Sequence, residues 1–274
     1  MSIIHTIHPV IQLDFSVLNK YLSAHIKNIV YEKRGGNLFY YWLDKQSIRG
    51  VDVSIEKEEY IEIRNTLMSN THDYFLTNEI IRAISMLTKG QVFDEEDNSV
   101  NADCTFNKHL IAELEKDHCK TVHFLSENKE DIAIFGPLRI VHFGKHTFSV
   151  LNPFANNPDK LTEEMFRISL HIQYNLPDYK DGSLMQIGEG ESKKILQMIT
   201  NLDNILISKF DFILLYNQGE SPIALENIIL NSILPEKWKL IDEFTFVATV
   251  LSDQEWTEFI SNAIKYNQVA TIQS

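Results

Sequence analysis

The first quarter of the chain shows a helical spacing of apolar residues, followed by segments with the pattern of strands. After Asp14, apolar residues recur at three- and four-residue steps, which is typical of an amphipathic helix that begins at an N-cap: Phe15, Leu18, Tyr21, Leu22 and Ile26. Segments 37–44, 51–55 and 60–64 are then aromatic-rich or alternate between apolar and polar residues, as strands do. We expect these three segments to form an antiparallel meander.

The helical period returns after the meander. Apolar residues at helical spacing predict a helix over residues 74–87, and Lys89 with Gly90 provides a good stop. The acidic segment 94–97 follows and is typical of a solvated loop. Residues 107–127 then carry apolar and charged residues on different helical faces, so they predict a second helix.

Short segments rich in β-branched and aromatic residues come next. Residues 132–135, 138–143 and 146–150 predict three strands. Gly144 stands between the last two segments, which predicts a tight hairpin there.

The strongest cluster of structure-breaking residues lies at 152–158, which contains two Pro and three Asn. We expect it to separate an N-terminal domain of residues 1–151 from a C-terminal domain of residues 159–274. Strands occur in groups rather than in strict alternation with helices. The pattern therefore predicts an α+β fold of mixed or antiparallel sheets with packed helices, in two subdomains.

The second half of the chain is less regular. Residues 162–174 predict an amphipathic helix, and 192–199 predict another. The long apolar run 205–216 fits one buried strand or a helix-to-strand transition, because periodicity does not separate the two. Residues 238–250 predict a strand, and the capping-box spacing at 252–255 predicts the start of a last helix.

Composition and charge limit the possible functions. The 274 residues are 44% hydrophobic and 23% charged, as in folded proteins with a full core. There are 25 Lys and Arg against 38 Asp and Glu, so the formal net charge is −13. A chain this acidic repels nucleic-acid phosphates and anionic membranes, so we expect neither as a partner. The same charge favours a basic protein partner.

The predicted location is the cytoplasm. The first residues lack both the positive start and the unbroken apolar run of a secretory signal. No apolar stretch reaches the ~20 residues that a membrane-spanning helix needs. Cys104 and Cys119 are the only cysteines, and we expect both to be free thiols.

No catalytic or cofactor motif is complete. The glycine-rich segment 188–193 lacks both phosphate-loop spacings, and its two Glu residues would repel a phosphate. Cys119 and His118 are neighbours on an expected helix, where their side chains point about 100° apart. His142 and His146 flank the expected hairpin and are candidate metal ligands, although no third ligand lies nearby. We predict no catalytic residue and no cofactor.

Two features are candidates for binding a partner. The acidic loop resembles a calcium-binding loop in composition but lacks the Gly and Glu that such a loop requires, so we expect a solvated acidic patch instead. The aromatic strand fits either a core strand or a recognition surface. The candidate residues are Asp94, Glu95, Glu96 and Asp97 from the loop, and Tyr40 and Trp42 from the strand.

One stretch resembles a known family. It runs from Arg49-Gly-Val-Asp-Val-Ser through Tyr60-Ile-Glu-Ile-Arg64 to the helix that ends at Leu87. This strand, strand, helix pattern resembles a family of uncharacterised bacterial cytosolic proteins, known only as a domain of unknown function. The resemblance implies a bacterial source and an unassigned role, and it supplies no catalytic residues.

Two hypotheses of function follow. The first is a non-enzymatic interaction protein, of immunity or accessory type, that captures a partner protein. The second is an enzyme or small-molecule-binding protein whose site assembles only in three dimensions, as catalytic triads do. Acidity and aromatic content favour the first hypothesis.

Overall fold

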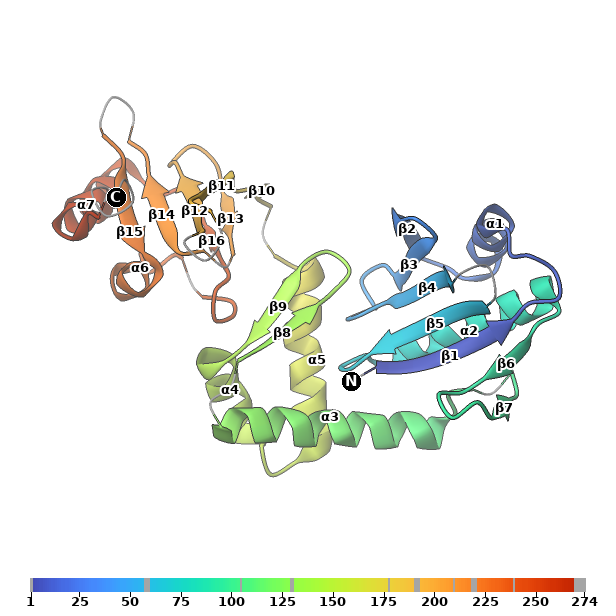
Figure 1. Ribbon diagram of the computed structural model, residues 1–274. Helices are drawn as coiled ribbons and strands as arrows, with labels where there is room; N and C mark the ends of the chain where they lie inside the picture. The colour runs from blue at the N-terminus through green and yellow to red at the C-terminus, as the bar shows by residue number, and fades with distance from the viewer. Residues whose placement is uncertain are drawn as a thin grey trace. The chain divides into compact units, whose positions relative to one another are not determined.

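The computed structural model divides into two compact units, Met1–Asn175 (unit 1) and Leu176–Ser274 (unit 2). Figure 1 shows both units, which are described separately below. The structure describes residues 2–56, 60–103, 105–128, 131–176, 178–189, 193–208, 210–217, 221–238 and 240–268. Residues 152–158, where a domain boundary was expected, lie inside unit 1. The division into domains 1–151 and 159–274 stays a prediction.

A seven-stranded antiparallel sheet forms the base of unit 1, with strand order β2-β3-β4-β5-β1-β6-β7. Its strands are β1 (Ser2–His8), β2 (Ile29–Gly35), β3 (Leu38–Leu43), β4 (Val51–Glu56), β5 (Tyr60–Thr66), β6 (Gln91–Phe93) and β7 (Ser99–Val100). Helices α1 (Phe15–His25) and α2 (Thr71–Thr88) pack on one face of this sheet (Figure 1). The meander of β3, β4 and β5 and the two helices confirm the sequence predictions.

Local signals explain where these helices begin and end. The Asp14 carboxylate accepts a 2.7 Å hydrogen bond from the Ser16 N–H at the start of α1. Asn70 and Asp73 form a reciprocal capping box at the start of α2. Lys89 ends α2 in the left-handed conformation, at φ 53°. Alternating residues of the strands, such as Tyr41 and Val53, are buried against the two helices.

The second half of unit 1 consists of helices and a β-hairpin. The elements are α3 (Lys108–Asn128), β8 (Ile132–Phe135), β9 (Ile140–Phe143), α4 (Lys145–Leu151), η1 (Asn152–Phe154) and α5 (Pro158–Tyr174). β8 and β9 pair in a two-stranded antiparallel sheet. α5 packs across α3 (Figure 1), and the Tyr174 hydroxyl at its end donates to the Ser47 carbonyl at 2.9 Å.

The predicted hairpin around Gly144 is wrong. Residues 146–150 belong to α4. The observed hairpin lies earlier in the chain and is formed by β8 and β9. Gly144 is the N-cap of α4, and its N–H donates to the Thr147 hydroxyl at 2.7 Å. The β-branched content of the segment favoured a strand, but this local capping and burial of Phe148 and Leu151 favour a helix.

Gln173 fastens the turn of this hairpin to α5. Its buried side-chain amide accepts from the N–H groups of Leu138 and Arg139, at 3.0 and 3.1 Å, and donates to the Arg139 carbonyl at 2.7 Å. Gln173→Ala leaves three partly buried backbone groups without these bonds, so we expect it to destabilise the hairpin by about 2–3 kcal/mol. Faster hydrogen exchange of the β8 and β9 amides is the measurement. The exposed neighbour His171→Ala is the control, and equal exchange in both variants would contradict the prediction.

The described residues of unit 2 form two small sheets, two α-helices and one 3-10 helix. A four-stranded sheet has the order β11-β12-β14-β15, and a three-stranded sheet has the order β10-β13-β16. The elements are β10 (Lys180–Asp181), β11 (Leu184–Ile187), β12 (Lys194–Ile199), β13 (Ile205–Ile207), β14 (Phe212–Leu215), β15 (Ile223–Glu226), α6 (Asn227–Ile233), β16 (Phe246–Ala248), α7 (Asp253–Ala263) and η3 (Ile264–Tyr266). Its core joins residues of both sheets to both helices, with Trp238 and Phe259 among them.

Several sequence predictions change in unit 2. The predicted helix over 192–199 is wrong, because residues 194–199 form β12 between two other strands of the sheet. The apolar run 205–216 forms two strands, β13 and β14, in different sheets. The strand expected over 238–250 shrinks to β16 and one bridge at Leu240. The capping box at the start of α7 is confirmed. Together the units confirm an α+β fold.

Candidate functional site

A groove in unit 2 combines an apolar floor with an acidic rim. It has a volume of about 330 Å³ and lies where α6, the turn after it and α7 meet. Its lining residues are Ile233, Pro235, Glu236, Lys237, Leu251, Glu255, Glu258, Phe259 and Asn262. We call this hollow the groove.

Trp238 fixes the turn that carries two of the lining residues. The Trp238 N–H donates to the Pro235 carbonyl at 2.8 Å, and the indole N–H donates to the Thr249 carbonyl at 2.7 Å. The fully buried ring meets Phe259 edge-on, with ring centres 5.0 Å apart. The backbone of Glu236 and Lys237 is therefore held beside α7 by the core.

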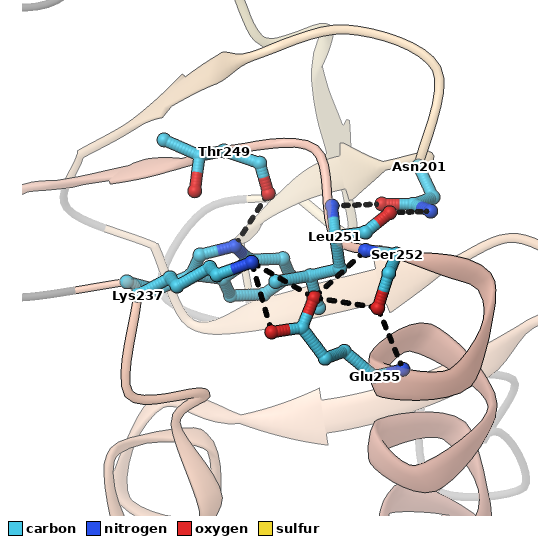
Figure 2. Close-up of polar contacts among 7 residues, drawn as sticks. Asn201, Lys237, Thr249, Leu251, Ser252 and Glu255 are labelled. Atoms are coloured by element: carbon cyan, nitrogen blue, oxygen red, sulfur yellow. Dashed lines mark hydrogen bonds and ion pairs between the residues drawn. The ribbon is translucent and has the colours of Figure 1, made fainter.

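The start of α7 forms the other wall. The Asn201 side chain accepts from the Leu251 N–H at 2.8 Å and donates to the Leu251 carbonyl at 2.9 Å. Ser252 then caps the helix, and Glu255 accepts hydrogen bonds from the Ser252 N–H at 2.8 Å and hydroxyl at 2.7 Å. Figure 2 shows how the two Ser252 contacts converge on the Glu255 carboxylate. Glu255 is thus oriented by its own helix cap.

Lys237 supplies a cation to this carboxylate. Its Nζ lies 2.8 Å from Oε1 and 2.9 Å from Oε2 of Glu255 (Figure 2). The hydrogen bond from Lys237, followed by those from Ser252, lowers the pKa of Glu255 to about 2. Glu255 is therefore a fixed negative charge at any pH above about 3.

The other two carboxylates of the rim have no such neighbour. Among the described residues, neither Glu236 nor Glu258 forms an ion pair with Lys or Arg, and Glu258 accepts only a 3.0 Å bond from the Gln254 amide. Below them lie the apolar side chains of Leu251 and Phe259. A long cationic side chain fits such a hollow, because its methylene stem covers apolar surface while its charge meets carboxylates.

The acidic loop predicted as a partner site is a tight turn between β6 and β7 of unit 1. Asp94 accepts from the N–H groups of Glu96 and Asn98, both at 2.9 Å, and these bonds, led by Asn98, lower its pKa. Glu95 accepts from the Ile4 N–H at 2.8 Å. Two of the four carboxylates are thus bonded to the protein's own backbone, and Glu96 and Asp97 remain as exposed charges.

Tyr40 and Trp42 lie on the sheet face opposite α1 and α2, since Tyr41 between them packs under those helices. They are 3% and 7% exposed. The Tyr40 hydroxyl donates to the Arg49 carbonyl, and the Arg34 guanidinium stacks 3.4 Å from the centre of the Tyr40 ring. This burial leaves little surface of either side chain for a partner.

The candidate metal ligands lie on different elements. His142 is on β9 and His146 is in the first turn of α4, without the hairpin that was expected to join them. The described residues contain no group of three or more His, Cys, Asp or Glu side chains placed to hold a metal ion.

Cys119 is a structural thiol. Its Sγ donates to the Pro158 carbonyl at 3.0 Å and shares a hydrogen bond with the Thr162 hydroxyl. Burial raises the pKa of the Cys119 thiol, and the neighbouring His118 ring instead accepts from the Met68 N–H at 3.3 Å. Cys104 and residues 190–192 of the glycine-rich segment lie outside the described residues.

The comparisons with known proteins concern unit 1. The family model described as domain of unknown function DUF4299 matches residues 5–173. The chain belongs to this family. The DUF4299 match covers nearly all of unit 1 and includes the stretch 49–87, so the predicted resemblance to a domain of unknown function is confirmed. No curated protein and no solved structure matches the chain. The groove lies beyond the DUF4299 residues.

Sequence reasoning missed the groove because its walls are separated along the chain. The capping box was predicted, which placed Glu255 near the start of a helix. Glu236 and Lys237 come from a turn that the sequence pattern assigned to no site, and the buried Trp238 anchors this turn beside α7. A Pro-Glu-Lys-Trp turn is a local signal, but it does not reveal its spatial neighbour.

Proposed function

We propose that the protein is a non-enzymatic interaction protein that binds a basic segment of a partner protein in the groove. The observation that carries the proposal is the groove itself, with its apolar floor and its three rim carboxylates, of which only Glu255 is paired with a lysine among the described residues. Charge complementarity of this kind steers a basic partner and fixes its orientation. A cytoplasmic location and a bacterial source are consistent with the proposal.

The charge of unit 2 supports this assignment. Residues 176–274 contain 14 acidic and seven basic residues, so the unit attracts cations beyond the groove as well. In the described chain, no helix has the length and apolarity needed to cross a bilayer. The acidic loop of unit 1 is the competing location, because it also leaves two carboxylates exposed.

Two matched double variants distinguish binding in the groove from binding at the acidic loop. A fluorescent pentapeptide of alternating Gly and Arg is the probe, and anisotropy measures its binding to the full chain. We expect Glu236→Gln with Glu258→Gln to weaken binding roughly tenfold, because two rim charges are lost while shape is kept. Glu96→Gln with Asp97→Asn removes the same charge from the acidic loop and should change binding little.

The outcomes decide between specific and general attraction. Loss of binding only in the loop variant would move the site to the acidic loop and overturn the proposal for the groove. Equal losses in both variants would indicate attraction to net charge alone. No binding of the peptide by the unmodified chain at low ionic strength, where rim charges act most strongly, would also overturn the proposal.

A further inference from the structure

Lys237 lies where a partner's cation would lie. Its ammonium contacts both oxygens of the Glu255 carboxylate, at 2.8 and 2.9 Å (Figure 2), and both residues line the groove. Within the described part of unit 2, this is the one lysine that lines the groove. The contact shows that this carboxylate accepts a cation carried on a long flexible side chain.

The contact is not needed to hold Glu255 in place. The Ser252 N–H and hydroxyl orient the carboxylate from within α7. The Lys237 and Glu255 side chains are 56% and 40% exposed, and exposed ion pairs contribute little to stability. Lys237 can therefore leave the carboxylate while its backbone stays anchored beside Trp238.

An arginine is a better occupant than a lysine. Its planar guanidinium presents two parallel N–H donors to the two oxygens of a carboxylate, whereas an ammonium is a point charge. It is also less strongly hydrated, which favours a position above the Leu251 and Phe259 floor. A bidentate pair at Glu255 would leave Glu236 and Glu258 to balance further positive charge.

We infer that Lys237 occupies the Glu255 carboxylate in the free protein and that an arginine side chain of the partner displaces it on binding. The inference rests on the proposed function and names the partner's recognised group. Lys237 competes with the partner for Glu255, so a partner side chain must bind this carboxylate more strongly than Lys237 does. An arginine meets this condition more easily than a lysine. The free energy needed to displace Lys237 is small because the internal ion pair is exposed.

Removing the Lys237 ammonium group tests the inference. We expect Lys237→Met, which keeps the apolar stem, to bind the Gly-Arg pentapeptide about threefold to fivefold more tightly than the unmodified chain. Lys237→Arg should bind it more weakly than the unmodified chain, because a guanidinium with two parallel N–H donors holds the Glu255 carboxylate more strongly than an ammonium does. The corresponding Gly-Lys pentapeptide should bind more weakly than the Gly-Arg peptide to every form.

Lys180→Met is the matched control. Lys180 forms a similar exposed ion pair with Asp203 at 2.7 Å in the same unit, outside the groove. Its loss changes net charge and frees a carboxylate as Lys237→Met does, so equal tightening in both variants would overturn the inference. Unchanged binding in Lys237→Met and Lys237→Arg would overturn it too, while leaving the proposed function intact. Absence of binding to the unmodified chain overturns the proposed function instead.

Discussion

Asp73→Ala is expected to destabilise unit 1 by about 4 kcal/mol, a large share of the 5–15 kcal/mol that stabilises a typical domain. The carboxylate is fully buried and accepts four backbone hydrogen bonds. One oxygen accepts from Ile48, Arg49 and Asn70, at 3.3, 3.1 and 3.0 Å, and the other accepts from Gly50 at 2.9 Å. Alanine leaves these four N–H groups, three of them buried, without an acceptor.

The loop that Asp73 holds has no easy alternative conformation. Gly50 adopts φ +71°, and a Cβ there would lie 2.6 Å from the Tyr41 carbonyl and 2.7 Å from the Tyr40 ring. The loop connects β3 to β4 and also carries Ser47, which accepts from Tyr174. Loss of Asp73 therefore loosens the loop, the start of α2 and the end of α5 together.

Hydrogen exchange of the α2 amides and urea unfolding measure the effect. Asp73→Asn keeps one carbonyl acceptor but turns an amide NH₂ towards donors, so its cost should lie between those of the unmodified chain and Asp73→Ala. Asp117→Ala, which removes an exposed carboxylate paired only with Lys120, should change stability little. Similar effects of Asp73→Ala and Asp117→Ala would show that the buried hydrogen bonds contribute nothing.

The Asp73 network shows what the sequence predicted and what it did not. Helix α2 was predicted from apolar spacing, and Lys89 was predicted to end it, because both signals are local. The partners of Asp73 at Ile48 to Gly50 lie more than 20 residues away, and no periodicity connects them. Strand segments of the meander were predicted for the same local reason.

The wrong predictions arise where local preference and tertiary burial disagree. Residues 194–199 were predicted as a helix, but β12 lies between β11 and β14, where it completes backbone pairing on both sides. For Tyr40 and Trp42 the sequence left both a core strand and a recognition surface open, because alternation alone does not tell which face of a strand is covered. The groove was not predicted at all, since Glu236 and Glu258 meet only through the fold.

Acid is expected to destabilise unit 1 between pH 6.5 and pH 4 through two buried histidines. Burial lowers the pKa of both His5 and His118 to about 4. His5 packs edge-on against Phe106, with ring centres 5.3 Å apart, and His118 accepts from the Met68 N–H through Nε2. Both arrangements require a neutral ring, because protonation places a charge in the core or turns an acceptor into a donor.

Stability falls with pH in this range because the folded and unfolded chains bind different numbers of protons. Above pH 6.5 both histidines are neutral in the folded and unfolded chain, so stability does not depend on them. As pH falls below 6.5, both histidines become protonated in the unfolded chain, whereas in the folded chain they stay neutral until about pH 4. The free energy of unfolding therefore falls through this window. At pH 5 each histidine should cost about 2 kcal/mol relative to pH 7.5.

The double variant His5→Phe with His118→Gln isolates this effect. Phenylalanine keeps the ring on Phe106, and glutamine keeps an acceptor for Met68, but neither side chain takes up a proton in this range. Burial raises the pKa of Asp52, Glu62 and Asp73, and these carboxyls favour the folded state as pH falls, equally in both proteins. The difference in unfolding free energy between pH 7.5 and 5 should therefore be about 4 kcal/mol more unfavourable in the unmodified chain. Parallel pH profiles of the two proteins would show that the histidines are not the groups that acid titrates.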